Sequence, residues 1–433
     1  MSSTKPIHSR LQDIFTAMPG YDPHAVSVEQ AQDIIGQFIQ PLHITEQLPL
    51  RQSLGRVLAE DIVSAMNVPA HDNSAMDGFA FRGDDLPAIQ DKQLRIVGTA
   101  LAGRAYPGQT ARDECIRITT GAVMPADCDT VIPQELVVAS SDTHITIPAG
   151  KLRAGDNRRL TGEDLAAGKT VIRKGKILQP ADLGLLASLG IAEASVQRRL
   201  RVAFFSTGDE LRSLGEPLDE GCVYDSNRYT LYGMLTRLGC EAIDMGVVKD
   251  NPDALEAALC QACENADAII TSGGVSVGAA DYTKEIMSKL GQVAFWSVAM
   301  RPGRPLAFGQ IASNNKSAFL FGLPGNPVAV MVSFYFFARK ALYQLMGAEA
   351  PSLPLIPATT VETIRKRPGR TEFQRGILTN TDNGELRVSV TGSQGSGILR
   401  SMSEANCIIV LRHDQNTVLS GEKVQVLLFD GLL

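Results

Sequence analysis

The order of apolar and polar positions predicts alternating strands and helices between residues 199 and 349. Short apolar runs, of the kind that buried parallel strands need, stand at 202–206, 242–248, 267–271, 293–298 and 318–322. Segments with helical spacing lie between them, at 228–238, 252–265 and 282–290, and a long apolar helix is predicted from Pro327. This alternation predicts a three-layer α/β domain, with a parallel sheet between helices on both faces.

The rest of the chain has different patterns. Glycine-punctuated short strands predict a small β domain at 67–164 and a barrel-like β domain at 350–433. Helical patterns on both sides of the first β domain, at 25–66 and 165–198, predict one discontinuous linker domain in which that β domain is inserted. Ser27 and Gln30 have the spacing of a capping box. Residues 1–24 are interpreted as a loose leader.

Length and charge narrow the function classes. The chain has 433 residues, which favours about three domains, and its formal net charge is −6. This charge argues against a nucleic-acid partner, which would need a basic face. It leaves room for a small anionic ligand, because a local group of arginines can outweigh the net charge.

Neither a membrane span nor a disulfide framework is expected. The first residues lack the apolar core of a signal peptide, and the apolar run Val328–Ala338 is too short to cross a bilayer. Seven cysteines without framework spacing predict a reducing compartment, the cytoplasm. Cys260 and Cys263 form a CxxC inside a helical pattern, where we interpret them as structural residues.

The stretch Thr271–Lys284, TSGGVSVGAADYTK, joins a predicted strand to a predicted helix. Glycines in such a turn let backbone N–H groups converge on an anion, and the helix N-terminus favours negative charge. A plain connecting loop is the alternative interpretation. Asp281 stands where either an N-cap or a metal ligand would stand. The candidate anion-binding residues are Ser272, Gly273, Gly274 and Ser276.

Three carboxylates should lie at one edge of the sheet, since the carboxyl ends of parallel strands share an edge. They are Glu210, Asp250 and Asp281. Carboxylates beside an anion loop suit Mg²⁺, which prefers oxygen ligands and bridges phosphates. The cations that could neutralise an anion are Lys284, Arg301, Arg304 and Arg375. The residues alone therefore predict a magnesium-dependent α/β enzyme that acts on phosphates.

Several longer motifs extend this interpretation. They are NSAMDGFA (73–80), TTGA (119–122), STGDEL (206–211), TSGGVSVGAADYTK (271–284), MRPGRPLAFG (300–309) and GLPGNPVAV (322–330). In this order they resemble the motifs of the molybdopterin molybdenumtransferase family, which includes bacterial MoeA proteins and the gephyrin E domain. The resemblance covers about residues 25–430.

The resemblance implies a four-domain homodimer that inserts molybdate into adenylylated molybdopterin, with Mg²⁺-dependent release of AMP. It implies a site between the α/β domain of one subunit and the inserted β domain of the other. The implied catalytic residues are Asp77, Thr120, Asp164, Glu210, Asp250 and Asp281, of which Asp250 and Asp281 would hold the metal and face the adenylate phosphate. The implied oxyanion residues are Arg301, Pro302, Arg375 and Ser396. Lys284, Arg304 and Pro305 are further substrate-binding candidates.

Three positions depart from the family pattern. Arg301 replaces a common lysine and offers different donor geometry. Ser297 stands where relatives often have a basic residue, and Ala329 where some have serine. These departures bear on single contacts within the implied site.

Other functions remain open on the sequence. An adenylyltransferase that makes adenylylated molybdopterin from ATP would share the α/β domain. A non-catalytic scaffold is compatible with the gephyrin resemblance, and a nucleotide pyrophosphatase would use similar groups. A molybdopterin adenylyltransferase is also a candidate partner of this protein.

Overall fold

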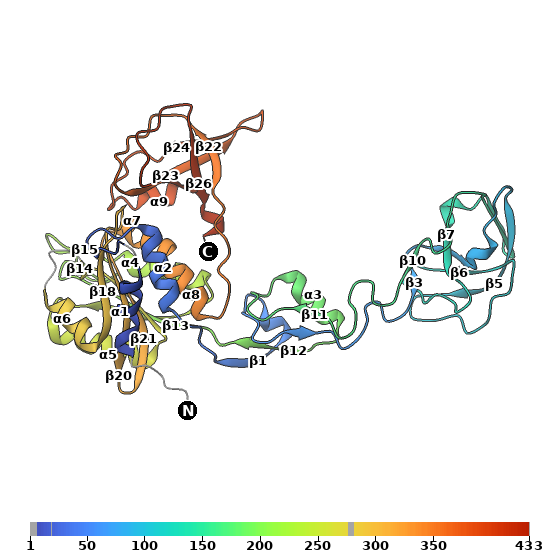
Figure 1. Ribbon diagram of the computed structural model, residues 1–433, viewed down its shortest axis with the longest axis horizontal. Coiled ribbons are helices and arrows are strands. Elements are labelled where there is room, and N and C mark those ends of the chain that lie inside the picture. The colour runs from blue at the N-terminus through green and yellow to red at the C-terminus, as the bar shows by residue number, and fades with distance from the viewer. Residues whose placement is uncertain (1–6, 19, 276–280, 433) are drawn as a thin grey trace. The chain divides into compact units, whose positions relative to one another are not determined.

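The computed structural model describes residues 7–18, 20–275 and 281–432. The chain forms two compact units (Figure 1). Unit 1 comprises Met1–Glu46, Gly55–Val57 and Gln197–Leu433, and unit 2 comprises Gln47–Leu54 and Leu58–Val196.

Unit 1 contains the predicted α/β domain. Its six-stranded sheet has the order β16-β13-β17-β21-β20-β18. The strands β16, β13, β17 and β21 are parallel neighbours, whereas β20 runs antiparallel to both β21 and β18. The sequence pattern did not indicate β20, which follows the proline-rich MRPGRP segment. The strand bounds are β13 Arg201–Thr207, β16 Glu241–Val248, β17 Ala268–Ser272, β18 Gly291–Ser297, β20 Pro305–Ser313 and β21 Lys316–Leu323.

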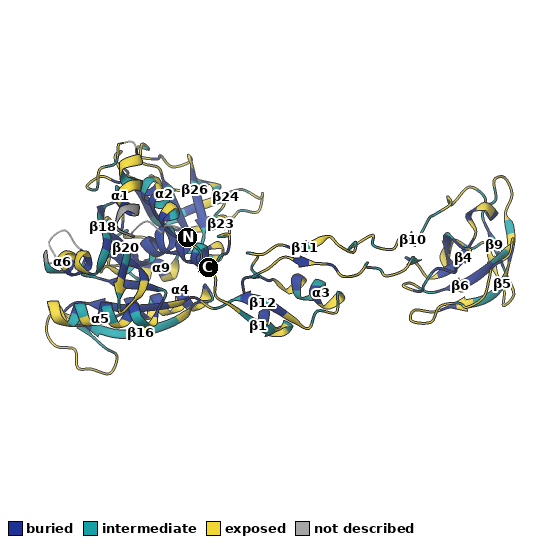
Figure 2. Ribbon diagram, turned by 60° about the horizontal axis from the view of Figure 1, so that its bottom comes forward, coloured by how far each residue is buried: buried dark blue, intermediate teal, exposed yellow. Residues whose placement is uncertain are grey.

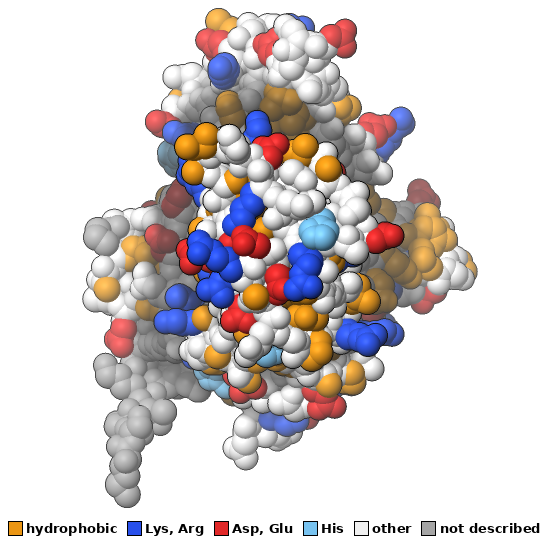
Figure 3. All heavy atoms as spheres, turned by 90° about the vertical axis from the view of Figure 1, so that its right-hand side faces the viewer, with side chains coloured by type: hydrophobic (Ala, Val, Ile, Leu, Met, Phe, Trp, Pro, Cys, Tyr) orange, Lys and Arg blue, Asp and Glu red, His pale blue; other side chains and the backbone are white. Residues whose placement is uncertain are grey.

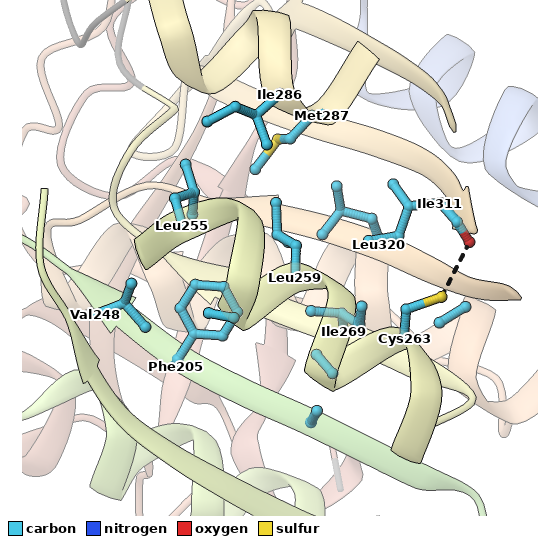
Figure 4. Close-up of a cluster of buried hydrophobic side chains, with 14 of the residues drawn as sticks. Phe205, Val248, Leu255, Leu259, Cys263, Ile269, Ile286, Met287, Ile311 and Leu320 are labelled. Atoms are coloured by element: carbon cyan, nitrogen blue, oxygen red, sulfur yellow. Dashed lines mark hydrogen bonds between the residues drawn. The ribbon is translucent and has the colours of Figure 1, made fainter. Parts of the chain in front are cut away.

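Helices cover this sheet at the predicted places. They are α4 Asn227–Arg237, α5 Pro252–Asn265, α6 Asp281–Leu290 and the continuous segment of α7 Pro327–Ser333, the π-helical Phe334–Ala338 and α8 Arg339–Leu345. The buried face of α5 carries Leu255, Leu259 and Cys263 at four-residue spacing, packed on the sheet (Figure 4). The Cys263 thiol lies 3.4 Å from the carbonyl oxygen of Ile311, so this half of the CxxC has a structural role.

The N-terminal helices belong with unit 1. Residues 1–24, expected to be a loose leader, contain helix α1 (Ile7–Ala17), on which Leu11 is buried. Helix α2 (Val28–Phe38) begins with the predicted capping box. Its Phe38 ring packs edge-to-face on Phe308 of β20, so this helix packs with the α/β domain. The sequence pattern had grouped this helix with residues 165–198, because an apolar helix face does not reveal which surface it covers.

The C-terminal segment closes into a barrel. Strand β23 pairs with both β24 and β25, which completes the cycle β23-β24-β22-β26-β25. Strand β19 (Met300–Arg301), from the α/β half of the chain, pairs in parallel with the start of β23. The bounds are β22 Ile356–Thr360, β23 Thr371–Asn380, β24 Leu386–Val390, helix α9 Arg400–Glu404, β25 Cys407–Leu411 and β26 Lys423–Leu428.

Unit 2 has separate apolar cores (Figure 2). One core joins residues from both sides of the insertion, including Leu58, Ile62, Ile172 and Leu186, with β2 (Ile62–Val63) paired to β11 (Thr170–Ile172). Strand β1 (Thr45–Pro49), helix α3 (Pro180–Ser188) and strand β12 (Glu193–Gln197) lie in the same stretches of chain. The domain boundaries within this unit stay a prediction.

The inserted β domain is a six-stranded sheet of order β7-β4-β6-β5-β9-β8. Its strands are β4 Gly78–Phe81, β5 Lys92–Ala100, β6 Glu114–Ile118, β7 Thr130–Pro133, β8 Ala139–Ser140 and β9 His144–Ile147, with the short pair β3 Asn73–Ser74 and β10 Arg158–Arg159. Basic and acidic side chains are interspersed on the face shown in Figure 3. Within this domain, Lys92 pairs with the buried Asp85 at 2.8 Å and with the exposed Asp113 at 2.6 Å.

No helix among the described residues is both long and apolar enough to cross a membrane.

Candidate active site

The parallel strands of unit 1 end at one edge of the sheet. Thr207 is in register with Val248, and Ser206 with Ser272, which is itself in register with Leu323. The loops that follow these four strands are therefore neighbours. A cavity of about 720 Å³, lined by Gly208, Asp209, Lys249 and other residues, opens beside the first two loops.

The predicted anion loop begins directly after β17. Gly273 and Gly274 have φ angles of +94° and +70°, in the left-handed region that favours glycine. A Cβ on Gly273 would lie 2.6 Å from the carbonyl oxygen of Thr207, so only glycine lets the two loops approach this closely. The backbone N–H of Gly273 donates to Leu323 at 3.1 Å. Ser276, the other predicted loop residue, lies outside the described residues.

Asn227, at the start of α4, joins two of these loops. Its Nδ2 donates to Ser272 Oγ at 2.7 Å and to the carbonyl oxygen of Gly325 at 2.6 Å. Asp225 sits beneath it: its Oδ1 accepts from the Asn227 backbone N–H and from Ser206 Oγ, both at 3.1 Å. Arg228 Nε donates to the other oxygen of Asp225 at 2.8 Å. This buried network fixes the ends of β13 and β17 and the loop after β21.

Two buried polar atoms at this edge have no hydrogen-bond partner among the described residues. They are Thr207 Oγ1 and Asn227 Oδ1. Thr207 Oγ1 also lies 3.0 Å from the positions that a Cβ on Gly273 or Gly274 would take. Because buried polar groups are nearly always hydrogen-bonded, these atoms fit a site that receives a polar ligand.

The predicted carboxylates are grouped in part. The Asp250 backbone N–H donates to Asp209 Oδ1 at 3.2 Å, and the Tyr282 hydroxyl donates to Asp250 Oδ1 at 3.1 Å. Burial and then the Asp250 carboxylate raise the pKa of Tyr282, so its hydroxyl stays a donor. The Glu210 carboxylate folds over Gly208, close to where a Cβ would lie. Asp281 is the first residue of α6, and its side chain lies outside the described residues.

The carboxylates described above would form only part of a magnesium site. Among the described residues, no three acidic, histidine or cysteine side chains form a group that could hold a metal. Mg²⁺, however, is usually bound through one or two carboxylates together with substrate phosphates. Asp250 and its neighbour Asp209 carry carboxylate oxygens of this kind.

Arg375, on β23, is a buried cation. Its side chain is 1% exposed, and among the described residues all its partners are neutral. Nε donates to Ser401 Oγ and Nη2 to the carbonyl oxygen of Gly395, both at 2.9 Å. Burial, with a smaller contribution from the charge of Arg301, lowers its pKa to about 10. A buried positive charge without a carboxylate favours an incoming anion.

The loop that Arg375 holds reaches the α/β domain. The carbonyl oxygen of Ser396, in this loop, accepts from the Val328 backbone N–H at 3.0 Å, in the first turn of α7. A cis peptide bond joins the exposed Arg301 to the buried Pro302. Arg301 is also in register with Glu372 on β23. The structure thus brings the predicted oxyanion residues of both segments into one neighbourhood.

Two predicted cations have other partners. Lys284 Nζ lies 5.9 Å from the centre of the Phe295 ring on β18, at the distance of a cation–π contact. Arg304 Nε donates to Ser297 Oγ at 2.9 Å. Ser297 and Pro305 face each other across the β18–β20 pair. Ser297 here orients the neighbouring guanidinium.

The remaining predicted residues lie in unit 2. Asp77 Oδ1 accepts from the Thr120 backbone N–H at 2.7 Å and from its hydroxyl at 3.0 Å. These two bonds, the backbone one first, lower the pKa of Asp77 and keep it ionised. Asp164 is exposed, and its backbone N–H donates to Val68 at 3.0 Å. The structure therefore groups Asp77 with Thr120 and does not group Asp164 with either.

Family models cover most of the chain. Residues 26–190 match the MoeA N-terminal region (domains I and II), 203–344 a probable molybdopterin binding domain, and 357–429 the MoeA C-terminal region (domain IV). A Haemophilus influenzae protein named molybdopterin molybdenumtransferase is 42% identical over 390 residues, which are 90% of this chain and 95% of that protein. This chain belongs to the molybdopterin molybdenumtransferase family. A Nostoc relative with the same name is 35% identical over 98% of this chain and 95% of its own length.

A solved structure of this family has the same fold. The molybdopterin biosynthesis moeA protein from Pyrococcus horikoshii OT3 superposes with a TM-score of 0.80 at 29% sequence identity. It covers 94% of this chain and all of its own. The expected fold class, an α/β domain combined with β domains, is confirmed.

Sequence reasoning missed several residues of the site. Asn227 and Asp225 lie in the segment VYDSNRY, whose only signal was a polar cluster before a helix. Asp209 and Tyr282 lay inside quoted motifs, but nothing in the spacing distinguished them from their neighbours. Ser401 follows the predicted Ser396 closely in sequence, but only the fold of the barrel places its hydroxyl on Arg375.

Proposed function

We propose that this protein is a transferase of molybdenum cofactor biosynthesis, which inserts molybdate into adenylylated molybdopterin and releases AMP. The observation that carries this proposal is the similarity along the whole chain to proteins named molybdopterin molybdenumtransferase. The geometry supports it, because an anion loop, a pair of carboxylates and a buried arginine lie within unit 1.

In unit 1, different groups of residues would bind the two anionic substrates. Ser272, Gly273 and Gly274 would bind the phosphate-bearing substrate, with Asn227 holding Ser272 in place. Arg375, Arg301 and the loop around Ser396 would bind the molybdate dianion. Catalysis would then come mainly from positioning the two anions together and neutralising their charge.

Mg²⁺ belongs to this proposal as well. Asp250, with Asp209 beside it and Asp281 at the start of α6, would hold the ion against the phosphate. Bound there, it would supply charge neutralisation at the phosphate during AMP release.

We further propose that the protein acts as a homodimer in which residues of both subunits complete each site, as the family resemblance implies. Asp77, Thr120 and Asp164 would then serve the partner subunit. Adenylylated molybdopterin would come from a molybdopterin adenylyltransferase, a candidate partner. The seven cysteines are all free thiols, which supports a reducing compartment, the cytoplasm.

Release of AMP tests this function. Purified protein is incubated with adenylylated molybdopterin and Mg²⁺, with and without molybdate. We expect AMP release only with molybdate, and a loss of roughly a hundredfold or more in Asp250→Asn. Asp382→Asn, which removes an exposed carboxylate in a turn of the barrel, serves as the matched control.

The other outcomes identify the competing functions. AMP release that is indifferent to molybdate would make the protein a pyrophosphatase. Consumption of ATP with non-adenylylated molybdopterin would make it an adenylyltransferase. No release under any condition would leave a scaffold, and the transferase proposal would fail.

A further inference from the structure

Arg301 also lines a concave basic surface. It is a pocket of about 770 Å³ lined by Arg301, Thr363, Arg365, Lys366, Arg367, Pro368, Gly369, Arg370, Glu372 and Thr417. Five of these ten residues are Lys or Arg and one is acidic, in a chain whose formal net charge is −6. We call it the basic pocket.

The cations of the basic pocket are of two kinds. Arg370 is neutralised, since its Nη2 lies 2.9 Å from Glu372 Oε1. Arg301, Arg365 and Arg367 are exposed, and none of them has a carboxylate within ion-pair distance among the described residues. Three guanidinium groups without counter-charges thus line one cavity.

Buried side chains hold the backbone that carries Arg365 and Arg367. Lys366 is 5% exposed, and its Nζ donates to the carbonyl oxygens of Gln415 (2.9 Å), Arg367 (3.2 Å) and His413 (3.4 Å). Ile364 packs in the barrel core and bridges Val418. Burial alternates along this segment, so Arg365 and Arg367 share the open face while their neighbours are fixed inside. The two arginines therefore project from a fixed backbone.

We propose that the basic pocket is a second binding site for a tetrahedral oxyanion such as molybdate or phosphate, built on Arg365 and Arg367 and distinct from the site at Arg375. Guanidinium groups bind such anions through paired N–H donors. Arg301 is common to both places: it lines the basic pocket, and its charge acts on Arg375. The pocket would hold oxyanion close to the site where it reacts. A concave cavity beside oxyanion residues favours a small anion over an acidic protein segment. The identity of the anion as molybdate rests on the proposed function.

Direct binding tests this proposal. Equilibrium dialysis of the full chain against molybdate, at about 0.05 M ionic strength to limit screening, should give two bound oxyanions per chain. Arg365→Gln/Arg367→Gln should reduce this to one. The control Arg387→Gln/Arg400→Gln removes the same charge from exposed positions of the C-terminal region and should leave two. Thermal unfolding of both variants confirms that they fold.

Kinetics gives a second readout. In the AMP-release assay, the Arg365→Gln/Arg367→Gln variant should raise the KM for molybdate about tenfold and leave kcat unchanged, because the lost contacts serve anion capture. If AMP release fails in the wild type while the binding count still falls from two to one, the proposed function is wrong and the basic pocket stands.

Two results would overturn the proposal. One is a single bound molybdate in the wild type that the double variant does not change. The other is binding of a poly-glutamate peptide that depends on Arg365 and Arg367 while molybdate binding does not, which would assign the basic pocket to an acidic protein partner.

Discussion

Single side chains decide how the strand-end loops of unit 1 are held. Asn227 is 6% exposed and donates to both Ser272 and Gly325, so one amide connects the anion loop with the loop before α7. A residue in such a position acts through the groups that it orients. Its removal would leave the buried Ser272 hydroxyl without this donor, at a cost of about 1–3 kcal/mol.

Asn227→Ala should therefore lower the rate of AMP release by roughly tenfold to a hundredfold, because small misplacements of binding groups are costly. Asn265→Ala is the matched control, since Asn265 is exposed and its amide bonds only within its own helix. Steady-state kinetics measures the rate of AMP release in both variants, and thermal unfolding measures their stability. Equal activities in the two variants would deny Asn227 a positioning role.

The hydrogen bonds from Thr120 predict how the ionisation of Asp77 depends on pH. Its folded pKa is lowered by the Thr120 backbone N–H and then by the hydroxyl, so this interaction is present above the ordinary carboxyl pKa and is lost as pH falls through the lowered value. Thr120→Val should raise the pKa of Asp77 only in part, since the backbone donor remains. Thr120→Ser should leave it low. Carbon-13 NMR titration of the carboxyl group checks this, and identical titrations of both variants would contradict it.

At the scale of elements, the anion loop depends on glycine where β17 turns toward α6. The φ angle of Gly273 is +94°, and the nearest obstacle to a Cβ is the Thr207 backbone, which cannot move aside as a flexible side chain could. Conformations of this kind cost a non-glycine residue about 1–3 kcal/mol. The loop is thus fixed by backbone geometry as much as by its hydroxyl groups.

Gly273→Ala should destabilise unit 1 by about 1–3 kcal/mol and weaken binding of the phosphate-bearing substrate. Gly233→Ala, on α4, meets no atom within 4 Å and should stabilise that helix by about 0.5–1 kcal/mol. Chemical denaturation and substrate titration would show the contrast. A Gly273→Ala protein that binds substrate as well as the wild type would exclude close backbone approach as the reason for glycine.

At the scale of the whole molecule, the predicted residues fall into two groups on two units. Asp77 and Thr120 are bonded to each other in unit 2, while Asp250, Ser272 and Arg375 lie in unit 1. Under the proposed homodimer, each reaction needs one group from each subunit. This arrangement can be tested without a structure of the dimer.

Co-expression of Asp77→Asn and Asp250→Asn chains should restore activity that each variant lacks alone. Random pairing makes about half of the dimers mixed, and each mixed dimer has one intact site of two, so about a quarter of wild-type activity is expected. Tandem affinity purification would isolate the mixed dimers, and their AMP release would then be measured. No recovery would mean that both groups must come from one chain.

The sequence by itself determined the elements and the kinds of chemistry. Apolar runs and helical spacing located five of the six strands of the α/β sheet, because burial imposes a period on each element. The glycine-rich motif brought Ser272 to attention, the position after a predicted strand brought Asp250, and its positive charge brought Arg375.

Only the tertiary structure decided which elements and side chains meet. Helix α2 packs on β20, Asn227 joins two loops, and Ser401 and the loop carbonyls surround Arg375. The basic pocket likewise combines Arg301 with residues that follow it by more than sixty positions. Such contacts join residues far apart in the chain, and local pattern carries no record of them, because packing depends on shape and not on sequence distance.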